Sequence, residues 1–289
     1  MYEAEINRKQ PACLLLLIDQ SYSMSEQWDS DVSKGQQLAT AVNRVLSSAV
    51  LQCSKGDDRV YDYFEVGVLG YGLDTGPVLH GSDASRPLVP VSEVANNPRR
   101  VDQVPRKIPD GAGGLVETTL NMPVWVDPLT NGKTPMVQAL RWAEQIVSSW
   151  CGQHPDSFPP IVLNLTDGVS TDGDPTEAGK RIQDVATNDG ASLLFNAHIS
   201  AAQGKEIAFP ANSSALPNEH ASTLFDISSV LPSTMAEAAS QAGYPIDPGA
   251  RGFLYNAHAT AVIEFLDIGT RAATPSGLAE LTTSADTGE

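Results

Sequence analysis

The sequence predicts an α/β protein with a mostly parallel sheet covered by helices on both faces. Two observations support this prediction: short, continuous apolar runs of strand length, and amphipathic helical patterns that separate them. A strand that is buried on both faces has no polar side, so its apolar pattern is continuous rather than alternating. Strands that alternate with helices along the chain are typical of α/β folds.

The predicted strands are apolar runs that end in turn-forming or acidic residues. They cover residues 12–18, 63–69, 160–165 and, more weakly, 191–199. The first run ends at Asp19 and the third ends within Thr166-Asp167-Gly168. Residues 224–231 are predicted to form a further strand at an edge of the sheet.

The predicted helices carry apolar residues at every third or fourth position. They cover residues 38–49, 137–150, 233–242 and 251–268. The first of these places Asn43 on its polar face. Another helix is predicted to begin near Asp174, because a proline and a capping-box glutamate follow this acid.

Residues 73–132 interrupt the alternation of strands and helices. They contain eight of the 20 prolines, and we expect an elaborated connection with an edge hairpin around residues 120–126. Its length makes this connection a candidate specificity element. We expect residues 1–268 to form one domain and residues 269–289 to form a flexible tail.

The composition excludes several classes of function. Lys and Arg number 18 against 35 Asp and Glu, which gives a net charge of -17. This charge disfavours binding to nucleic acid or to an anionic membrane surface.

The three cysteines lie far apart and form no Cys-x-x-Cys pair. The early apolar run is too short for a signal peptide or a membrane span. We therefore expect a cytoplasmic protein.

Two acids and three hydroxyls lie where a parallel sheet would present them together. Asp19 opens the segment that contains Ser21 and Ser23, Asp167 ends another strand, and Thr134 precedes a predicted helix. Ligands of open α/β sheets bind beyond the carboxyl ends of the strands. Carboxylate and hydroxyl oxygens suit a hard divalent cation such as magnesium. These five residues are the candidate metal ligands.

The order of these motifs resembles the metal-ion-dependent adhesion site of von Willebrand factor A (vWA) domains. The matching pieces are Asp-x-Ser-x-Ser from Asp19, Gly-x-Thr-Pro-Met around Thr134, and Thr-Asp-Gly around Asp167. The resemblance covers about residues 10–200, and its second piece is similar to the intracellular bacterial branch of the family. It implies a Rossmann-like, six-stranded, mostly parallel sheet flanked by helices on both faces.

The resemblance also implies roles for the five residues. Ser21, Ser23 and Thr134 would contact the metal directly, and Asp19 and Asp167 would hold it directly or through water. The expected ion is Mg²⁺, with Mn²⁺ or Ca²⁺ as alternatives. The remaining position would go to water or to an acidic side chain of a partner protein.

Members of this family bind proteins and do not catalyse reactions, so the resemblance implies a binding module rather than an enzyme. Its bacterial relatives are often encoded beside Ser/Thr kinases and phosphatases or accompany AAA-type ATPases. One residue departs from the family pattern: Tyr22 stands where a small residue, commonly glycine, is usual.

Other interpretations of the same residues remain open. A magnesium-dependent phosphohydrolase could use Asp19 as its nucleophile, although Ser21 stands where that chemistry wants a second aspartate. A metal could also serve only to stabilise the fold. Thr134 alone could be a helix N-cap before Pro135. Asp172 and Asp174 could be extra ligands, although helix capping explains Asp174 more simply.

Several common sites are absent from the sequence. There is no Walker phosphate loop, no nucleophile elbow, no EF-hand register and no zinc-like histidine spacing. The five histidines are therefore interpreted as structural.

Overall fold

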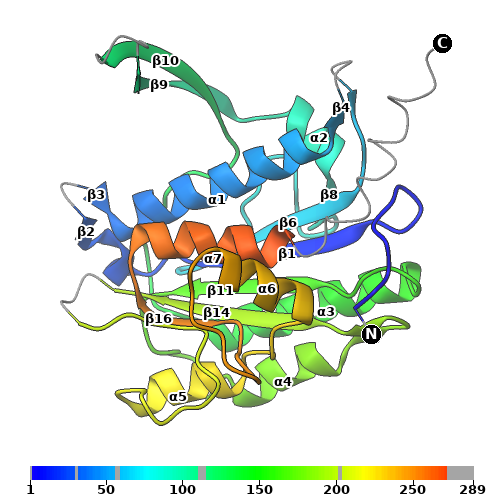
Figure 1. The fold of residues 1–289 in the computed structure, drawn as a ribbon, viewed down its shortest axis with the longest axis vertical. Coiled ribbons are helices and arrows are strands. Elements are labelled where there is room, and N and C mark those ends of the chain that lie inside the picture. The colour runs from blue at the N-terminus through cyan, green and yellow to red at the C-terminus, as the bar shows by residue number, and fades with distance from the viewer. Residues whose placement is uncertain (1, 30–31, 56–58, 110–114, 201–203, 272–289) are drawn as a thin grey trace.

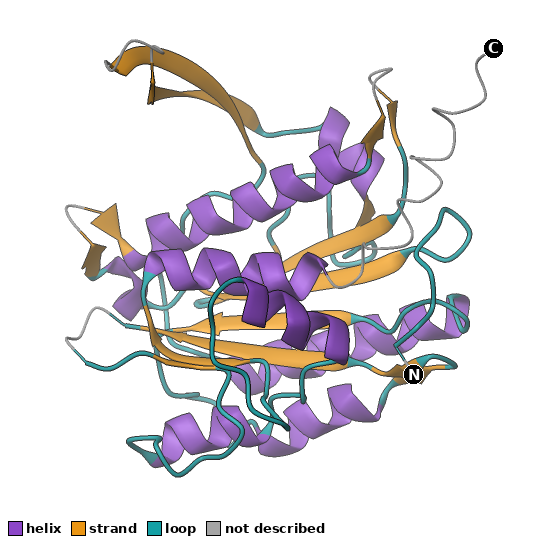
Figure 2. Ribbon diagram, in the orientation of Figure 1, coloured by secondary structure: helices purple, strands orange, loops and turns teal. Residues whose placement is uncertain are grey.

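The computed structural model describes residues 2–29, 32–55, 59–109, 115–200 and 204–271 (Figure 1). It has a central sheet with helices on both faces (Figure 2), as the sequence predicts. The helices are α1 (Lys34–Gln52), α2 (Val91–Asn96), α3 (Met136–Gln153), α4 (Thr176–Asp184), α5 (Glu219–Asp226), α6 (Ser233–Gln241) and α7 (Ala259–Arg271). A short 3-10 helix, η1 (Tyr22–Ser25), follows the first strand.

Five parallel strands form the middle of the sheet. In spatial order they are β6 (Phe64–Tyr71), β1 (Ala12–Asp19), β11 (Ile161–Thr166), β14 (Leu193–Ile199) and β16 (Phe253–Ala257). Short antiparallel strands extend the edges: β7 (Thr75–Pro77) and β8 (Val89–Pro90) pair with β6, and β15 (Ile207–Ala208) pairs with β16. Among the described residues the sheet therefore has eight strands instead of the expected six. The difference comes from the three short edge strands, each of which pairs over only two or three residues.

In the described ranges, four small two-stranded sheets lie outside the central sheet. They are formed by β2 (Gln27–Asp29) with β3 (Val32–Ser33), β4 (Ser54–Lys55) with β5 (Arg59–Val60), β9 (Arg100–Pro109) with β10 (Leu115–Val124), and β12 (Ala186–Thr187) with β13 (Gly190–Ala191).

The alternation of side chains in β1 divides the core into two layers. Leu14 and Leu16 pack in one apolar cluster with residues of α1, α2, α6 and α7. Leu15 and Leu17 pack in the other cluster with residues of α3, α4 and α5. Successive strand residues point to opposite faces of a sheet. The continuous apolar pattern of this strand thus reflects burial on both faces.

Two predictions for the C-terminal third are wrong. Residues 224–231 are not a strand, because α5 continues to Asp226 and only Val230 makes a bridge, to Arg251. The side chain of Asn218 caps this helix by accepting a hydrogen bond from the amide of Ala221 at 2.8 Å.

The predicted helix over residues 251–268 is a strand followed by a helix. Residues 253–257 form β16 and pair with β14, and α7 begins only at Ala259. A five-residue apolar run fits either structure by its pattern alone, and here pairing with the sheet decides. The helix continues to Arg271, past the predicted start of the tail, and residues 272–289 lie outside the described part of the chain.

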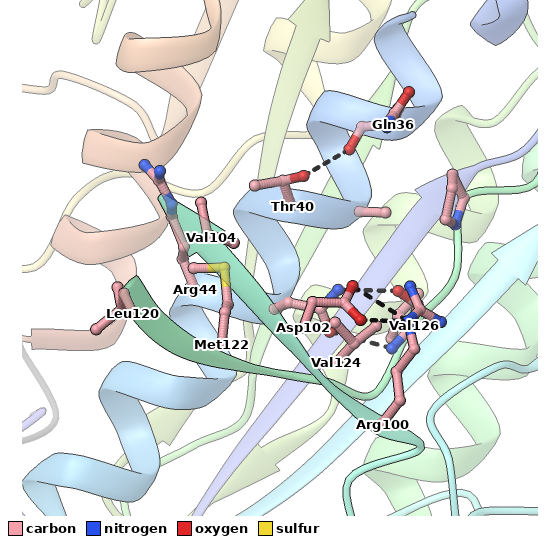
Figure 3. Close-up of a pocket in the computed structure, with 13 residues that line it drawn as sticks. Gln36, Thr40, Arg44, Arg100, Asp102, Val104, Leu120, Met122, Val124 and Val126 are labelled. Atoms are coloured by element: carbon pink, nitrogen blue, oxygen red, sulfur yellow. Dashed lines mark hydrogen bonds and ion pairs between the residues drawn. The ribbon is translucent and has the colours of Figure 1, made fainter. Parts of the chain in front are cut away.

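The long connection carries a hairpin that extends away from the sheet (Figure 1). The hairpin consists of β9 and β10, so it is longer than the predicted one at residues 120–126. A groove of about 670 Å³ lies between this hairpin and α1 (Figure 3), and Arg44, Val104, Leu120 and Met122 are among its lining residues.

Asn43 is predicted to lie on the polar face of α1, but the structure buries it. The residue is 4% exposed, and its side-chain oxygen accepts hydrogen bonds from the amides of Trp125 at 2.9 Å and Val126 at 3.1 Å. Its side-chain nitrogen donates to the Val126 carbonyl at 2.8 Å. A single buried side chain thus attaches the end of the long connection to α1.

No helix in the described ranges is both long enough and apolar enough to cross a membrane.

Candidate metal centre

The carboxyl ends of β1 and β11 bring the predicted acids to one edge of the sheet. The two strands are parallel neighbours, and Ile18 is paired with Leu165. Asp19 ends β1 and Asp167 directly follows β11. After Asp19 the chain turns through η1, which carries Ser23. Residues far apart in sequence therefore meet at this edge for the reason the sequence suggested.

Hydrogen bonds connect four of the five candidate ligands. The amide of Ser21 donates to Asp19 Oδ1 at 2.8 Å. The hydroxyls of Ser21 and Ser23 are 3.0 Å apart. Ser23 Oγ donates to Asp167 Oδ1 at 2.7 Å. The side chains thus form a continuous cluster of oxygen atoms.

Thr134 lies beside this cluster. Thr134 is 5% exposed. Its hydroxyl oxygen faces Gly168, the residue after Asp167: a Cβ atom added to this glycine would lie 3.6 Å from that oxygen. Its amide donates to Thr171 Oγ1 at 3.1 Å, and its carbonyl accepts from the Thr171 amide at 2.9 Å. These backbone contacts position the hydroxyl next to the turn that carries Asp167.

Thr134 is not the N-cap of the following helix, so that interpretation is wrong. Helix α3 begins at Met136, and Asp172 binds its first turn instead. The Asp172 carboxylate accepts from the amides of Val137 at 3.0 Å and Gln138 at 2.9 Å. Helix α4 begins at Thr176 with Pro175 at its N-cap position, one residue later than predicted. Asp174 precedes that position and accepts from the amide of Thr176 at 2.9 Å.

Replacing Asp172 with alanine is expected to lower the free energy of unfolding by about 1–2 kcal/mol, because two N-terminal amides of α3 lose their acceptor. Urea denaturation would measure this loss. Mg²⁺ affinity is expected to change by less than about threefold, since the carboxylate is bound to the helix; a much larger loss of affinity would identify Asp172 as a ligand.

Asp19 is held in a fixed position by hydrogen bonds to both of its oxygens. Besides the Ser21 amide, Thr166 Oγ1 donates to Asp19 Oδ2 at 2.7 Å. Burial raises the pKa of Asp19 to about 6, against the opposing effect of the hydrogen bonds from Ser21 and Thr166, and the nearby charge of Asp167 raises it further. A bound cation would favour the ionised carboxylate. The sequence gives Thr166 no evident role, because only the pairing of β1 with β11 brings its hydroxyl to Asp19.

Lys34 is the second residue that sequence analysis missed. Its ammonium donates to Asp167 Oδ2 at 2.9 Å and to Glu26 Oε2 at 2.7 Å. Burial lowers the pKa of Lys34, but the hydrogen bonds to Glu26 and Asp167 outweigh this effect and raise it overall. A sequence signal existed: Lys34 lies four residues before Leu38, on the apolar stripe of α1.

The donor set fits a hard divalent cation, because every predicted side chain offers oxygen. Among the described residues, no group of three or more His, Cys, Asp or Glu side chains is placed to hold a metal. A centre at this edge would therefore depend on hydroxyls as well as on Asp19 and Asp167. The unusual Tyr22 does not fill the cluster: it is 66% exposed, and its amide donates to the Gly132 carbonyl at 3.0 Å.

A pocket of about 650 Å³ opens beside Asp167 and is lined partly by His198, His220 and Tyr255. His198 stacks on Tyr255 with ring centroids 4.6 Å apart. Burial, together with the neighbouring His220, lowers the pKa of His198 to about 4, so this imidazole is neutral at pH 7. These histidines, interpreted as structural, also form one wall next to the candidate centre.

Comparisons with known proteins do not assign a family. No family model matches the chain, and no curated protein does. Solved structures with a similar course of the chain include the mussel byssus proximal thread matrix protein 1, with TM-score 0.48, 13% identity and coverage of 93% of this chain and 49% of that chain. Manganese-loaded TRAP of Plasmodium vivax has TM-score 0.39, 14% identity and coverage of 92% and 74%.

A third similar structure is the ArnB paralog VWA2 of Sulfolobus acidocaldarius, with TM-score 0.35, 12% identity and coverage of 66% of this chain and 35% of that chain. The chain thus spans about half of the mussel protein and about a third of the archaeal one.

Proposed function

We propose that the protein is a divalent-metal-dependent protein-binding module of the vWA type, of the intracellular bacterial kind. The observation that supports this proposal is the continuous cluster of hydroxyls and carboxylates at the carboxyl edge of the sheet. In it, Ser21 Oγ lies 3.0 Å from Ser23 Oγ, which donates to Asp167 at 2.7 Å. Thr134 completes the set from the loop before α3.

Ser21, Ser23 and Thr134 would hold Mg²⁺ by their hydroxyls, with Mn²⁺ or Ca²⁺ as alternatives, and Asp19 and Asp167 would hold it directly or through water. When bound, the cation supplies an electrophilic position for a carboxylate of a partner protein. The chain has a net charge of -17, so a bridging cation would offset the repulsion that an acidic partner meets.

The surface around the cluster would complete the contact. Tyr22 is exposed next to the two serines, and aromatic residues are common anchors at protein interfaces. The proposal places the protein in the cytoplasm, acting with a kinase and phosphatase or an AAA-type ATPase system.

The phosphohydrolase alternative gains no support from the geometry of Asp19. The residue is 1% exposed, and both of its oxygens accept hydrogen bonds. A nucleophile has to reach its substrate in line. That the chain is not an enzyme stays a prediction.

Affinity capture from the lysate of the source organism tests the proposal. The immobilised protein is used with Mg²⁺, with EDTA, and as the Asp19→Ala variant with Mg²⁺, and bound proteins are identified by mass spectrometry. We expect a partner that only the wild-type protein retains, and only with Mg²⁺. The same partners in all three samples would contradict a metal-dependent module.

A further inference from the structure

A buried lysine lies against the candidate metal centre. The side chain of Lys34 is 6% exposed, and its ammonium is 2.9 Å from an oxygen of Asp167, whose side chain is 0% exposed. The other partner, Glu26, is 2.7 Å from the ammonium and has a 64% exposed side chain. The lysine thus connects a buried candidate ligand to an acid at the surface.

The position of Lys34 is unfavourable without these partners. It is the first residue of α1, where the positive end of the helix dipole disfavours a cation. A buried ammonium also loses its hydration, so it is rarely found without an anionic partner. The contact with Asp167 therefore offsets both the unfavourable helix dipole and the loss of hydration.

Lys34 and Ser23 together fix the orientation of Asp167. One carboxylate oxygen accepts from Ser23 Oγ at 2.7 Å, and the other accepts from Lys34 Nζ at 2.9 Å. The carboxylate is therefore neutralised and oriented without a metal. A divalent cation held by the same carboxylate would be close to the ammonium, and the two positive charges would repel each other.

We propose that Lys34 is the internal counter-ion of the metal centre: it positions Asp167 in the metal-free protein and lowers the affinity of the centre for divalent cations. This inference rests on the proposed function, since it concerns the same centre. Glu26 makes such an arrangement workable, because the ammonium keeps one carboxylate partner when a metal neutralises Asp167.

Lys34→Met tests the inference, because methionine removes the charge and can stay buried. Isothermal titration with Mg²⁺ and with Mn²⁺ is expected to give a Kd at least about tenfold lower than that of the wild type, through loss of the repulsion. The metal-free variant is expected to melt at a lower temperature, because Asp167 loses its cation. Added metal should then raise its melting temperature more than that of the wild type.

Lys180→Met is the matched control. Lys180 is an exposed lysine on α4, so its replacement changes the net charge equally without touching the centre. Its metal affinity and melting temperature are expected to equal those of the wild type. Structural damage alone would weaken metal binding, so a gain of affinity in Lys34→Met distinguishes a counter-ion from a packing residue.

The outcomes separate this inference from the proposed function. Metal binding by the wild type with an equal or higher Kd in Lys34→Met would overturn the inference alone. No metal binding by either protein would contradict both. If Lys34→Met does not fold without metal, the inference predicts that Lys34→Met/Asp167→Asn folds, since this variant removes both charges of the buried Lys34–Asp167 pair. Failure of the double variant to fold would overturn the inference.

Discussion

Asp19→Ala is expected to weaken Mg²⁺ binding by about 100-fold or more. The substitution removes a negative charge from the centre, and it also removes the carboxylate that orients the loop with the two serines. Loss of residues that only support a metal ligand already costs about 10- to 100-fold in affinity. Asp19 also accepts from the Ser21 amide and from Thr166 Oγ1, so the variant loses the position of the loop too. Isothermal titration with Mg²⁺ would measure the change.

Asp247→Ala is the control for this prediction. Asp247 is an exposed acid in the loop between α6 and β16, and the variant has the same net charge as Asp19→Ala. Its Mg²⁺ affinity is expected to equal that of the wild type. Equal affinities for all three proteins would show that Asp19 does not contribute to a metal centre.

Asn43→Leu is expected to lower the free energy of unfolding by about 3–5 kcal/mol. The side chain bonds the amides of Trp125 and Val126 and the carbonyl of Val126. Leucine leaves these three backbone groups buried without partners, and each such group costs about 1–3 kcal/mol. Chemical denaturation monitored by circular dichroism would give the difference.

Arg44→Gln is the matched control, since Arg44 is the exposed neighbour of Asn43 on the same helix. It is expected to change the free energy of unfolding by less than about 0.5 kcal/mol. A loss of less than about 1 kcal/mol in Asn43→Leu would mean that the backbone groups find other partners, and that Asn43 does not hold the long connection in place.

The apolar pattern along a segment was sufficient to predict the strands that are buried on both faces and the long helices that bury one face. Strands β1, β6, β11 and β14 and helices α1 and α3 lie where their apolar patterns predict. The same patterns placed Asp19 and Asp167 at strand ends, and parallel pairing of β1 with β11 brings those ends together. This is why the candidate ligands could be selected from the sequence.

Contacts distant in sequence could not be predicted in this way. Lys34 and Asp167 are 133 residues apart, and only the folded sheet shows that the ammonium needs this carboxylate. The helical pattern predicts a polar face for Asn43, and this is wrong because its buried partners come from the far end of the long connection. The short apolar run of β16 was ambiguous by itself, because strand and helix segments of that length share one pattern.

A crystal grown with Mn²⁺ and measured at the manganese absorption edge tests the central claim most directly. The account predicts an anomalous peak in contact with the hydroxyls of Ser21, Ser23 and Thr134, with Asp19 and Asp167 bound directly or through water. The same peak should be missing from crystals of Asp19→Ala. A map of the wild type without a peak among these oxygens, or with its peak elsewhere, would contradict the account.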